Sequence, residues 1–534
     1  SACLVGSEMC IRDRFNIAFR TPPKDSTGVA HILEHSVLCG SREFPLKDPF
    51  VELVKGSLNT FLNAMTYPDK TCYPVASCND KDFQNLMHVY LDAVFYPNIY
   101  KREEIFRQEG WNYHLEQKEG PLKYNGVVYN EMKGVYASPD ATIDSTMNRL
   151  LFPDNCYRFQ SGGDPEHITE LTYENYIANY KRFYHPSNAY IILDGDMEID
   201  AVLAKIGNVL SEYDRLDIDS KIPIQKPVRP EECICSYEIG SNEEAEHKMI
   251  LAGGWVYGRF DELEKDIACS VLAELLCSSN ESPLKRAILE KGLAEDVEFG
   301  KIDGIQQSYL KLVIRNTSEE KKEEVWDTIY ATLKTLASQG IDHKRLESIL
   351  SRMEFNIREK ESGSFPEGVM YAIQMLESCL YGGDPAQNLC YNQVFSSIRN
   401  KIEKGYFEQL IKEVLLENPH YARISLQPSK TLGEEKRIRE RERLQTIKEQ
   451  WSEEERQKVV GEFQHLREVQ GTPDNFEQLA ALPMLSLSDI SEEVEEVSQV
   501  VTEVEGNQVL LQRLETEGIT HITYYFSLED QTLE

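Results

Sequence analysis

The sequence predicts an α+β fold, in which units that combine a mixed sheet with helices are repeated and then followed by a helical hairpin linker. Strand-like alternation at residues 15–20 precedes a series of helical patterns at residues 80–95, 102–116, 125–136 and 172–183. A second strand-and-helix unit starts near residue 249, and residues 434–469 are mostly charged helix formers. A chain of 534 residues is too long for a single hydrophobic core, so we expect three or four structural units.

The first unit, residues 15–230, opens with a strand that leads into a histidine-bearing helix. Thr21-Pro22-Pro23 ends the strand, and Ser26 and Thr27 can cap the helix that follows. Residues 57–76 mix Asn, Thr and Tyr with apolar residues around a Pro-Asp turn signal, so we interpret them as a hairpin or a pair of edge strands. A strand at 189–193 and a helix at 198–213 complete this unit.

The second unit, residues 231–430, repeats the strand-and-helix pattern without another His-x-x-Glu-His motif. A stretch at 225–232 with two prolines and many charges suits a linker between the two units. A strand is predicted at 249–255. Helices are predicted at 262–277, 282–291 and 318–338.

The charged stretch predicts a helical hairpin linker over residues 431–472. Its break falls at Trp451-Ser452, where Ser452 and Glu455 fit a capping box that opens the second helix. Residues 473–534 alternate in part as strands do, and we expect them to be the truncated start of a second half. At the other end, we expect residues 1–14 to be a non-native or disordered start.

Composition argues against two classes of partner. With 57 Lys and Arg against 90 Asp and Glu, the net charge of −33 argues against nucleic acid and for neutral or cationic partners. No apolar run approaches the roughly 20 residues of a spanning helix, so we expect no membrane partner. The 12 cysteines lack the regular spacing of a disulfide scaffold and are predicted to be reduced. The start lacks a secretory signal, so we expect a cytoplasmic protein.

The helix near residue 30 carries the motif that we expect to hold the chemistry. Positions i, i+3 and i+4 of a helix lie on one side, so His31, Glu34 and His35 project together. Two neutral imidazoles can ligate one zinc ion, and a carboxylate outside the coordination sphere can take a proton from the water that the ion polarises. The alternative is a pair of solvated or core histidines on an ordinary helix, because five-residue motifs also arise by chance.

Catalytic zinc usually has three protein ligands, so the motif needs another His, Asp or Glu downstream. Glu131 is the best candidate, because it shares a helix face with valines such as Val127 and Val135 that should carry its carboxylate towards the apolar interior. A cation would relieve the cost of burying that carboxylate. The alternatives are a buried structural glutamate paired with Arg or Lys, and a third ligand at Glu109 or Glu116.

Longer segments resemble a known family. The resemblance is carried by five segments in family order: TGVAHILEHSVLCGS, SLNTFLNAMTYPDKTCYP, GVVYNEMKGVY, SGGDP and RFYHPSNAYIILDGD. They resemble the presequence-protease branch of the pitrilysin/insulinase-type inverted zincin metallopeptidases, from Phe15 to the end of the chain. The resemblance implies the pitrilysin-type peptidase fold, one zinc ion held by His31, His35 and Glu131, and Glu34 as the general base.

The resemblance also implies roles around the zinc. Glu109 would be a carboxylate that orients a ligand from outside the coordination sphere, with a surface helix glutamate as the alternative. Asn63 and Ala64 would belong to an edge strand to which a substrate peptide adds a strand through backbone hydrogen bonds. The alternative for these two residues is a plain edge strand.

By the same resemblance, the chain is a zinc metalloendopeptidase that degrades unstructured peptides, such as targeting peptides, inside a closed chamber. Its acidic balance favours basic peptides. Family members continue through a second half that supplies an Arg and a Tyr to the substrate, and no segment here matches it. We therefore expect the missing second half of the same polypeptide as a partner, and a weak or inactive isolated chain.

Two other functions stay open. The family fold also serves as a non-peptidase partner subunit, and the chain could equally be a catalytically incomplete fragment, although inactive subunits usually lose the His-Glu-His residues found here. The charged hairpin at 434–469 could be a coiled-coil module for a partner protein. Its apolar positions, such as Leu444, Val459 and Val460, are too few for a sustained heptad repeat, which favours an internal linker.

Overall fold

The computed structural model describes residues 13–229, 231–359, 363, 365–492, 499–513 and 518–526. The prediction that residues 1–14 lie outside the fold is wrong for Asp13 and Arg14, which belong to the first strand and pair with Ser77 and Ala76. Residues 1–12 lie outside the described part of the chain.

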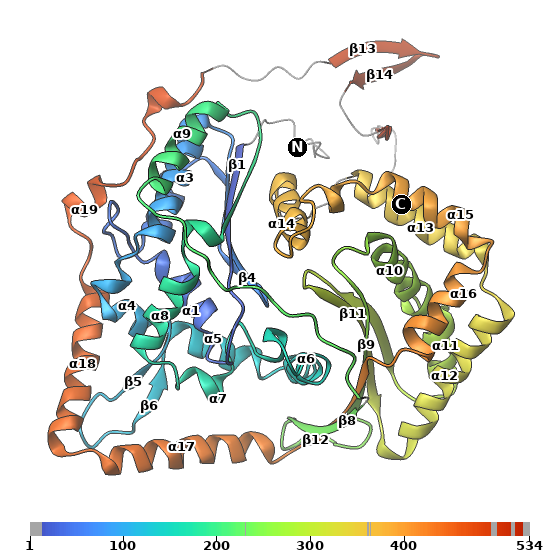
Figure 1. The fold of residues 1–534 in the computed structure, drawn as a ribbon, viewed down its shortest axis with the longest axis horizontal. Helices are drawn as coiled ribbons and strands as arrows, with labels where there is room; N and C mark the ends of the chain where they lie inside the picture. The colour runs from blue at the N-terminus through green and yellow to red at the C-terminus, as the bar shows by residue number, and fades with distance from the viewer. Residues whose placement is uncertain are drawn as a thin grey trace, which may run out of the picture.

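The first of two five-stranded sheets is antiparallel and runs in the order β2-β4-β1-β7, with the short β3 also paired to β4 (Figure 1). Its strands are β1 (Asp13–Arg20), β2 (Asn59–Leu62), β3 (Met65–Thr66), β4 (Lys70–Ser77) and β7 (Ala189–Asp194). Alternate β1 residues, Phe15, Ile17 and Phe19, are fully buried in the core beneath one face. The helices of this core include α1 (Val29–Val37), α3 (Asp80–Phe95), α8 (Tyr173–Phe183) and α9 (Ile199–Leu210).

The second sheet is mixed and runs in the order β10-β11-β9-β12-β8, with β8 parallel to β12. Its strands are β8 (Glu231–Glu238), β9 (Met249–Arg259), β10 (Asp296–Ile302), β11 (Gln307–Thr317) and β12 (Tyr421–Ser429). The core on one face is formed with α10 (Leu263–Cys277), α11 (Pro283–Glu290), α12 (Lys322–Gln339), α13 (His343–Glu359), α15 (Asn392–Ile402) and α16 (Tyr406–Ile411). The helical patterns of the sequence predicted the first three of these helices, and the last three were not predicted.

The two units exchange a helix. α6 (Pro139–Leu151) precedes the second unit in sequence, yet Ile143, Met147 and Leu151 pack against the second sheet. Conversely, α14 (Glu367–Cys379) follows the second sheet's first strands, yet it packs against the first sheet, next to Ala18 and Cys72. Both helices lie between the sheets in Figure 1. A division of the chain at residue 230 therefore separates each sheet from one of its covering helices.

Between α3 and α6 lies the segment that the sequence pattern described least well. The predicted helix at 102–116 is wrong beyond Glu109: α4 (Glu103–Glu109) ends there, and β5 (Asn112–His114) pairs with β6 (Lys123–Asn125). The aromatic residues after Gly110 favour this strand, and Gly110 ends the helix. The remaining helices of the first unit are α2 (Pro49–Gly56), α5 (Val127–Val135) and α7 (Pro165–Ile168).

The helical hairpin is present as predicted, as α17 (Leu432–Gln450) and α18 (Glu453–Gly471). The capping box between Ser452 and Glu455 is confirmed. Leu444, Val459 and Val460 are buried in the core of the first unit, so these side chains are not available to a coiled-coil partner. Figure 1 shows α17 along the lower edge and α18 along the left edge of this unit.

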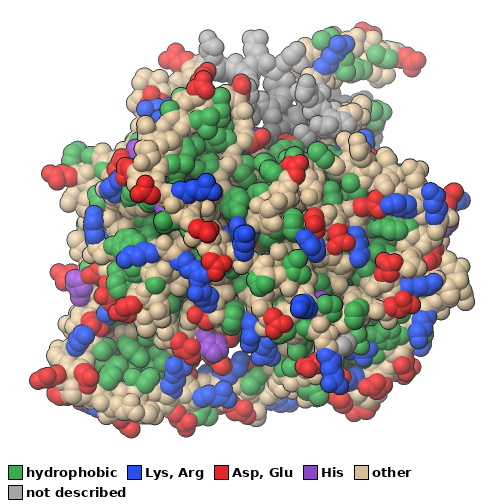
Figure 2. Space-filling model, in the orientation of Figure 1, with side chains coloured by type: hydrophobic (Ala, Val, Ile, Leu, Met, Phe, Trp, Pro, Cys, Tyr) green, Lys and Arg blue, Asp and Glu red, His purple; other side chains and the backbone are tan. Residues whose placement is uncertain are grey.

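After the hairpin, the chain continues through α19 (Phe476–Ala480) to the two-stranded β13 (Gln499–Val504) and β14 (Asn507–Gln512), which confirms strands in this region. None of the helices in the described residues has the length and apolarity needed to cross a bilayer. The cytoplasmic location stays a prediction. Figure 2 shows acidic and basic side chains interspersed over the visible face, so the excess of acidic residues does not form one patch there.

A buried carboxylate joins the two sheets where β4 begins. Asp69 is fully buried, and its Oδ2 accepts hydrogen bonds from the hydroxyls of Tyr157 at 2.6 Å and Tyr381 at 2.5 Å. Burial and the negative charge of Asp69 raise the pKa of both tyrosines well above their usual range, so both remain donors. The equally buried Lys70 lies 3.5 Å from Asp69 Oδ1 and donates to the carbonyl oxygen of Gly304, between β10 and β11, at 2.7 Å.

We expect Asp69→Ala to lower the free energy of unfolding by about 3 to 5 kcal/mol, because it leaves Lys70 and two tyrosine hydroxyls buried without their acceptor. Urea unfolding followed by circular dichroism measures the change. Asp144→Ala is the matched control, since it removes an ion pair with Lys311 that also joins the two units but is partly exposed. The control should cost under about 1 kcal/mol. Equal losses in the two variants would contradict a special role for Asp69.

Candidate metal centre

Two histidines from α1 and one glutamate from α5 converge on one point. His31 Nε2 lies 3.7 Å and His35 Nε2 lies 3.9 Å from Glu131 Oε2. One ligand atom from each of the three residues lies within 4.8 Å of the other two. The i, i+4 spacing on α1 places the imidazoles side by side, with ring centroids 4.9 Å apart. The structure therefore brings together the three residues predicted as ligands.

The other nitrogen of each imidazole is held by a hydrogen-bond acceptor. His31 Nδ1 lies 3.0 Å from the carbonyl oxygen of Gly162, and His35 Nδ1 lies 3.2 Å from Glu109 Oε2. A carbonyl oxygen and a carboxylate accept but do not donate, so Nδ1 of each ring carries the proton. In the neutral tautomer, this leaves the lone pair on Nε2, which faces Glu131 in both residues.

The donor set fits a small divalent cation such as zinc. Two ligands at about 2.1 Å from a tetrahedral zinc ion lie about 3.4 Å apart, close to the spacing found between the imidazoles and Glu131. Two imidazole nitrogens and one carboxylate oxygen are a ligand combination that catalytic zinc uses. Burial lowers the pKa of His35, but the hydrogen bond to Glu109 and the charges of Glu34, Glu109 and Glu131 outweigh it and raise the pKa overall. The surroundings thus favour positive charge at this point.

Glu34 projects from the same helix into a less exposed position. Its carboxylate is buried, with 8% of the residue exposed, and Oε2 accepts a hydrogen bond from the Thr66 hydroxyl at 2.8 Å. A buried carboxylate needs such a partner. Thr66 lies in β3 at the edge of the first sheet, so this bond also fixes α1 relative to that edge.

Glycines, rather than a capping side chain, set the start of α1. The prediction that Ser26 and Thr27 cap the helix is wrong: the N-cap residue is Gly28, with φ of 68°, and it makes no side-chain cap. A Cβ on Gly28 would lie 2.6 Å from Gly163 Cα, so only glycine permits this close approach. The approach brings the carbonyl of Gly162 to His31.

Glu131 reaches the site from an exposed position, not from the apolar interior. Its side chain is 50% exposed, and Val127 and Val135 are also exposed, at 43% and 46%. The expectation that these valines mark a buried face is wrong. α5 instead buries Val128, Tyr129 and Met132, and Glu131 faces the histidines across the gap between two helices.

The alternatives for the third ligand separate clearly. Glu109 is 7% exposed and lies at Nδ1 of His35, on the far side of the ring from Glu131, so it is placed to orient a ligand. Glu116 is largely exposed and pairs with His114. Its distance in the fold from α1 and α5 is set by the β5–β6 hairpin, which the predicted long helix would have excluded.

Asn63 and Ala64 lie between β2 and β3, at the outer edge of the first sheet. The amide of Asn63 donates to the carbonyl oxygen of Pro74 in β4 at 3.3 Å. The amide of Ala64 donates to the side-chain oxygen of Asn63 at 3.0 Å. These residues thus interrupt the edge strand and are followed directly by β3, which carries Thr66.

Four residues around the site were not singled out from the sequence. Gly162 and Thr66 contact His31 and Glu34, and Gln108 and Cys39 contact Glu109 Oε1 at 2.8 Å and 3.7 Å. Gly162 and Thr66 lie within segments that resemble the family, SGGDP and SLNTFLNAMTYPDKTCYP, which was the available signal. Only the fold shows what they contact.

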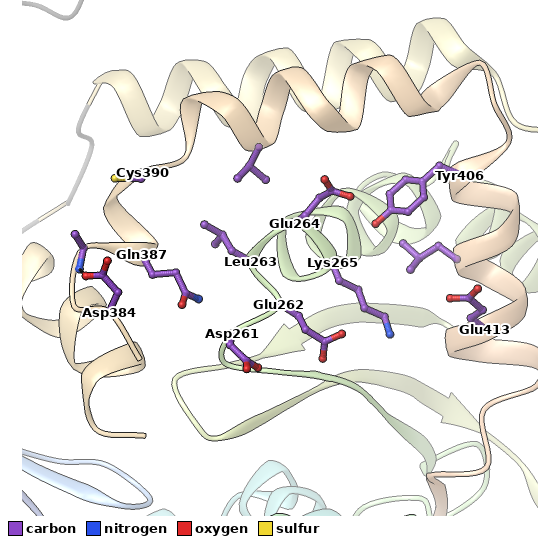
Figure 3. A pocket seen from close by; sticks show the side chains of 13 residues that line it. Asp261, Glu262, Leu263, Glu264, Lys265, Asp384, Gln387, Cys390, Tyr406 and Glu413 are labelled. Atoms are coloured by element: carbon purple, nitrogen blue, oxygen red, sulfur yellow. Dashed lines mark hydrogen bonds between the residues drawn. The ribbon is translucent and has the colours of Figure 1, made fainter. Parts of the chain in front are cut away.

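A separate hollow lies in the second unit. It has a volume of about 850 Å³ and is lined by residues of α10, α15, α16 and the segment before α15 (Figure 3). The lining includes the carboxylates of Asp261, Glu262, Glu264, Asp384 and Glu413 and the ammonium group of Lys265. None of the residues of the metal centre lines it.

Three family models match parts of the chain. The model "Insulinase (Peptidase family M16)" matches residues 20–120, and "Peptidase M16 inactive domain" matches residues 170–353. The model of the region associated with subfamily C of the M16 peptidases matches residues 426–534. The first match contains His31, Glu34, His35 and Glu109. Glu131 lies between the first and second matches.

Relatives in sequence span nearly the whole chain. "Protein HypA" of Clostridium perfringens is 44% identical over 96% of this chain and 53% of the relative. "Presequence protease 1, chloroplastic/mitochondrial" of Arabidopsis thaliana is 40% identical over 96% of this chain and 48% of the relative. The chain therefore spans about half the length of these relatives.

Solved structures share the fold at low identity. A protease from Helicobacter pylori matches with a TM-score of 0.60 and 16% identity, over 78% of this chain and 94% of that one. Pitrilysin matches with a TM-score of 0.54 and 13% identity, over 79% of this chain and 43% of that one. These likenesses confirm the predicted pitrilysin-type α+β fold.

Proposed function

Because this chain belongs to the presequence-protease branch of the M16, pitrilysin-type peptidases, we propose that it is a zinc metalloendopeptidase that cleaves unstructured peptides. The observation that carries the proposal is the convergence of His31, His35 and Glu131, with both imidazoles turned to present Nε2. Peptides such as targeting sequences are the proposed substrates. The name of the Arabidopsis relative supports this substrate class.

In the proposed mechanism, the chain's own residues hold the metal and move one proton. His31, His35 and Glu131 would be its ligands. A zinc ion bound there would supply Lewis acidity to a water molecule and to the scissile carbonyl. Glu34, held through Oε2 by Thr66, would accept the proton of the attacking water and pass it to the leaving amine. Gly162 and Glu109 would keep the imidazoles oriented.

The sheet edge beside Glu34 is the proposed place for the substrate. A peptide could pair with the outer side of the edge at Asn63 and Ala64, which precede β3. The Ala64 amide now bonds to the Asn63 side chain, so a substrate carbonyl oxygen would replace that acceptor. Recognition through the backbone would tolerate many sequences. The closed chamber and the second half that completes it are proposed from the longer relatives, of which this chain spans about half.

We expect the purified chain to bind about one zinc ion, because three ligands converge at one point. His31→Ala, His35→Ala and Glu131→Ala should each lower the zinc content measured by elemental analysis after gel filtration. His114→Ala is the control, since His114 pairs only with Glu116 among the ion pairs of the described residues. Unchanged zinc in Glu131→Ala would contradict its role as third ligand and would point to Glu109 or Glu116.

Glu34→Gln should keep the zinc but lower peptide hydrolysis by about 10²- to 10⁴-fold, because an amide cannot accept the proton of the attacking water. The assay combines this chain with the second half of the Clostridium perfringens relative and uses a quenched fluorescent peptide. Glu116→Gln serves as the control for loss of one carboxylate. Turnover near the wild-type rate by Glu34→Gln, with full zinc content, would rule out Glu34 as the base.

Tested alone, the chain should cleave such a peptide at least about 10²- to 10³-fold more slowly than a full-length relative, even with zinc bound. The resemblance assigns to the second half the donors that stabilise charge on the scissile carbonyl, and loss of one such donor typically costs that much. Loss of a closed chamber adds a positioning penalty. Adding the second half as a separate chain should restore activity. Full activity of the isolated chain would show that it needs no second half.

A further inference from the structure

The α17–α18 hairpin lies along the segment that carries two carboxylates of the metal centre. This segment runs α4, β5, β6, α5, with Glu109 at the end of α4 and Glu131 within α5. A close approach of Gly110 and Gly126 joins its two helices, since a Cβ on Gly126 would lie 2.2 Å from the Gly110 carbonyl oxygen. Figure 1 shows the hairpin enclosing this segment at the lower left.

The second helix of the hairpin contacts α4 directly beside Glu109. Glu462 accepts a hydrogen bond from Arg107 at 2.6 Å. Further along α18, the Gln470 side chain donates to Gln108 Oε1 at 3.2 Å, and Gln108 Nε2 donates to Glu109 Oε1 at 2.8 Å. Glu109 Oε2 in turn lies 3.2 Å from Nδ1 of His35. A hydrogen-bonded chain thus runs from α18 to a predicted zinc ligand.

The first helix of the hairpin contacts α5 beside Glu131. Glu440 accepts a hydrogen bond from Lys133 at 2.7 Å, two residues after Glu131. The guanidinium of Arg443 lies 5.9 Å from the ring centre of Tyr124 in β6, which leads into α5. α5 has only nine residues and buries three of them, so contacts from outside contribute much of what fixes its position.

We propose that the hairpin positions the metal centre, with Arg107 and Glu462 setting the place of Glu109 and with Lys133 and Glu440 setting the place of Glu131. The inference rests on the proposed zinc function and extends it to residues that touch neither metal nor substrate. Partners outside the coordination sphere commonly change metal affinity 10- to 100-fold. These pairs lie one step further out, so we expect smaller changes.

Charge alone makes the opposite prediction for half of the variants. Lys133→Gln and Arg107→Gln remove positive charge near the site, which by electrostatics would strengthen zinc binding. Glu440→Gln and Glu462→Gln remove negative charge, which would weaken it. If the pairs act by positioning, all four variants weaken zinc binding, because each one frees either α4 or α5 from the hairpin.

The test measures zinc affinity by competition with a chromophoric chelator, together with amide hydrogen exchange of residues 103–135 in the metal-free chain. We expect each of the four variants to bind zinc about three- to tenfold more weakly and to exchange faster in α4 or α5. Lys118→Gln and Glu453→Gln are matched controls, because this exposed pair joins the same hairpin to the loop between β5 and β6. Both controls should keep wild-type affinity and exchange.

Unchanged affinity in the four variants, or changes whose sign follows charge, would overturn the inference while leaving the proposed function intact. Equal effects in the controls would also overturn it, because they would show a general loss of stability. A wild-type chain that binds no zinc would instead remove the proposed function. In that case the exchange measurement still decides the positioning: faster exchange confined to the four variants supports it, and unchanged exchange overturns it.

Discussion

The buried carboxylate of Asp69 is the interaction on which both sheets and the candidate site depend. A charge with no solvent around it must be neutralised by partners, and here they come from Lys70 and from Tyr157 and Tyr381, 88 and 312 residues along the chain. All converge on the turn between β3 and β4. Three residues before Asp69, Thr66 holds Glu34. The contact between the units and the position of the candidate base are therefore set by one hairpin.

The metal centre combines one local constraint with several distant ones. The spacing of His31, Glu34 and His35 is a property of any α-helix, so it needs no tertiary structure. The position of Glu131 depends on the meeting of Gly110 with Gly126, and the orientation of His31 depends on the meeting of Gly28 with Gly163. In each case two backbones approach so closely that a side chain would not fit. Glycine is used here to bring polar atoms together.

The sequence therefore predicted the local features well and the long-range ones poorly. Helical periodicity located α3 to the residue, and the capping box located the start of α18. Glu131 was identified as the third candidate, although the argument from burial was wrong and the resemblance supplied the better reason. The contact of Gly162 with His31 spans 131 residues and has no periodic signal. The exchange of α6 and α14 is equally hidden, because an amphipathic pattern shows that a helix packs but not against which sheet.

The second unit shows why the same architecture need not bind a metal. β9, β10 and β11 occupy in the second sheet the places of β1, β2 and β4 in the first, and α10 follows β9 as α1 follows β1. At the side of α10 that faces β10, the carboxylate of Asp266 accepts hydrogen bonds from Tyr257 and from Lys301, each at 2.5 Å. Lys301 also lies 2.8 Å from Asp303. An ammonium group supplied by the chain thus neutralises the carboxylates here, whereas the first unit leaves two imidazoles and a carboxylate facing one another. A unit that carries its own cation gains stability at this position and loses the ability to bind another.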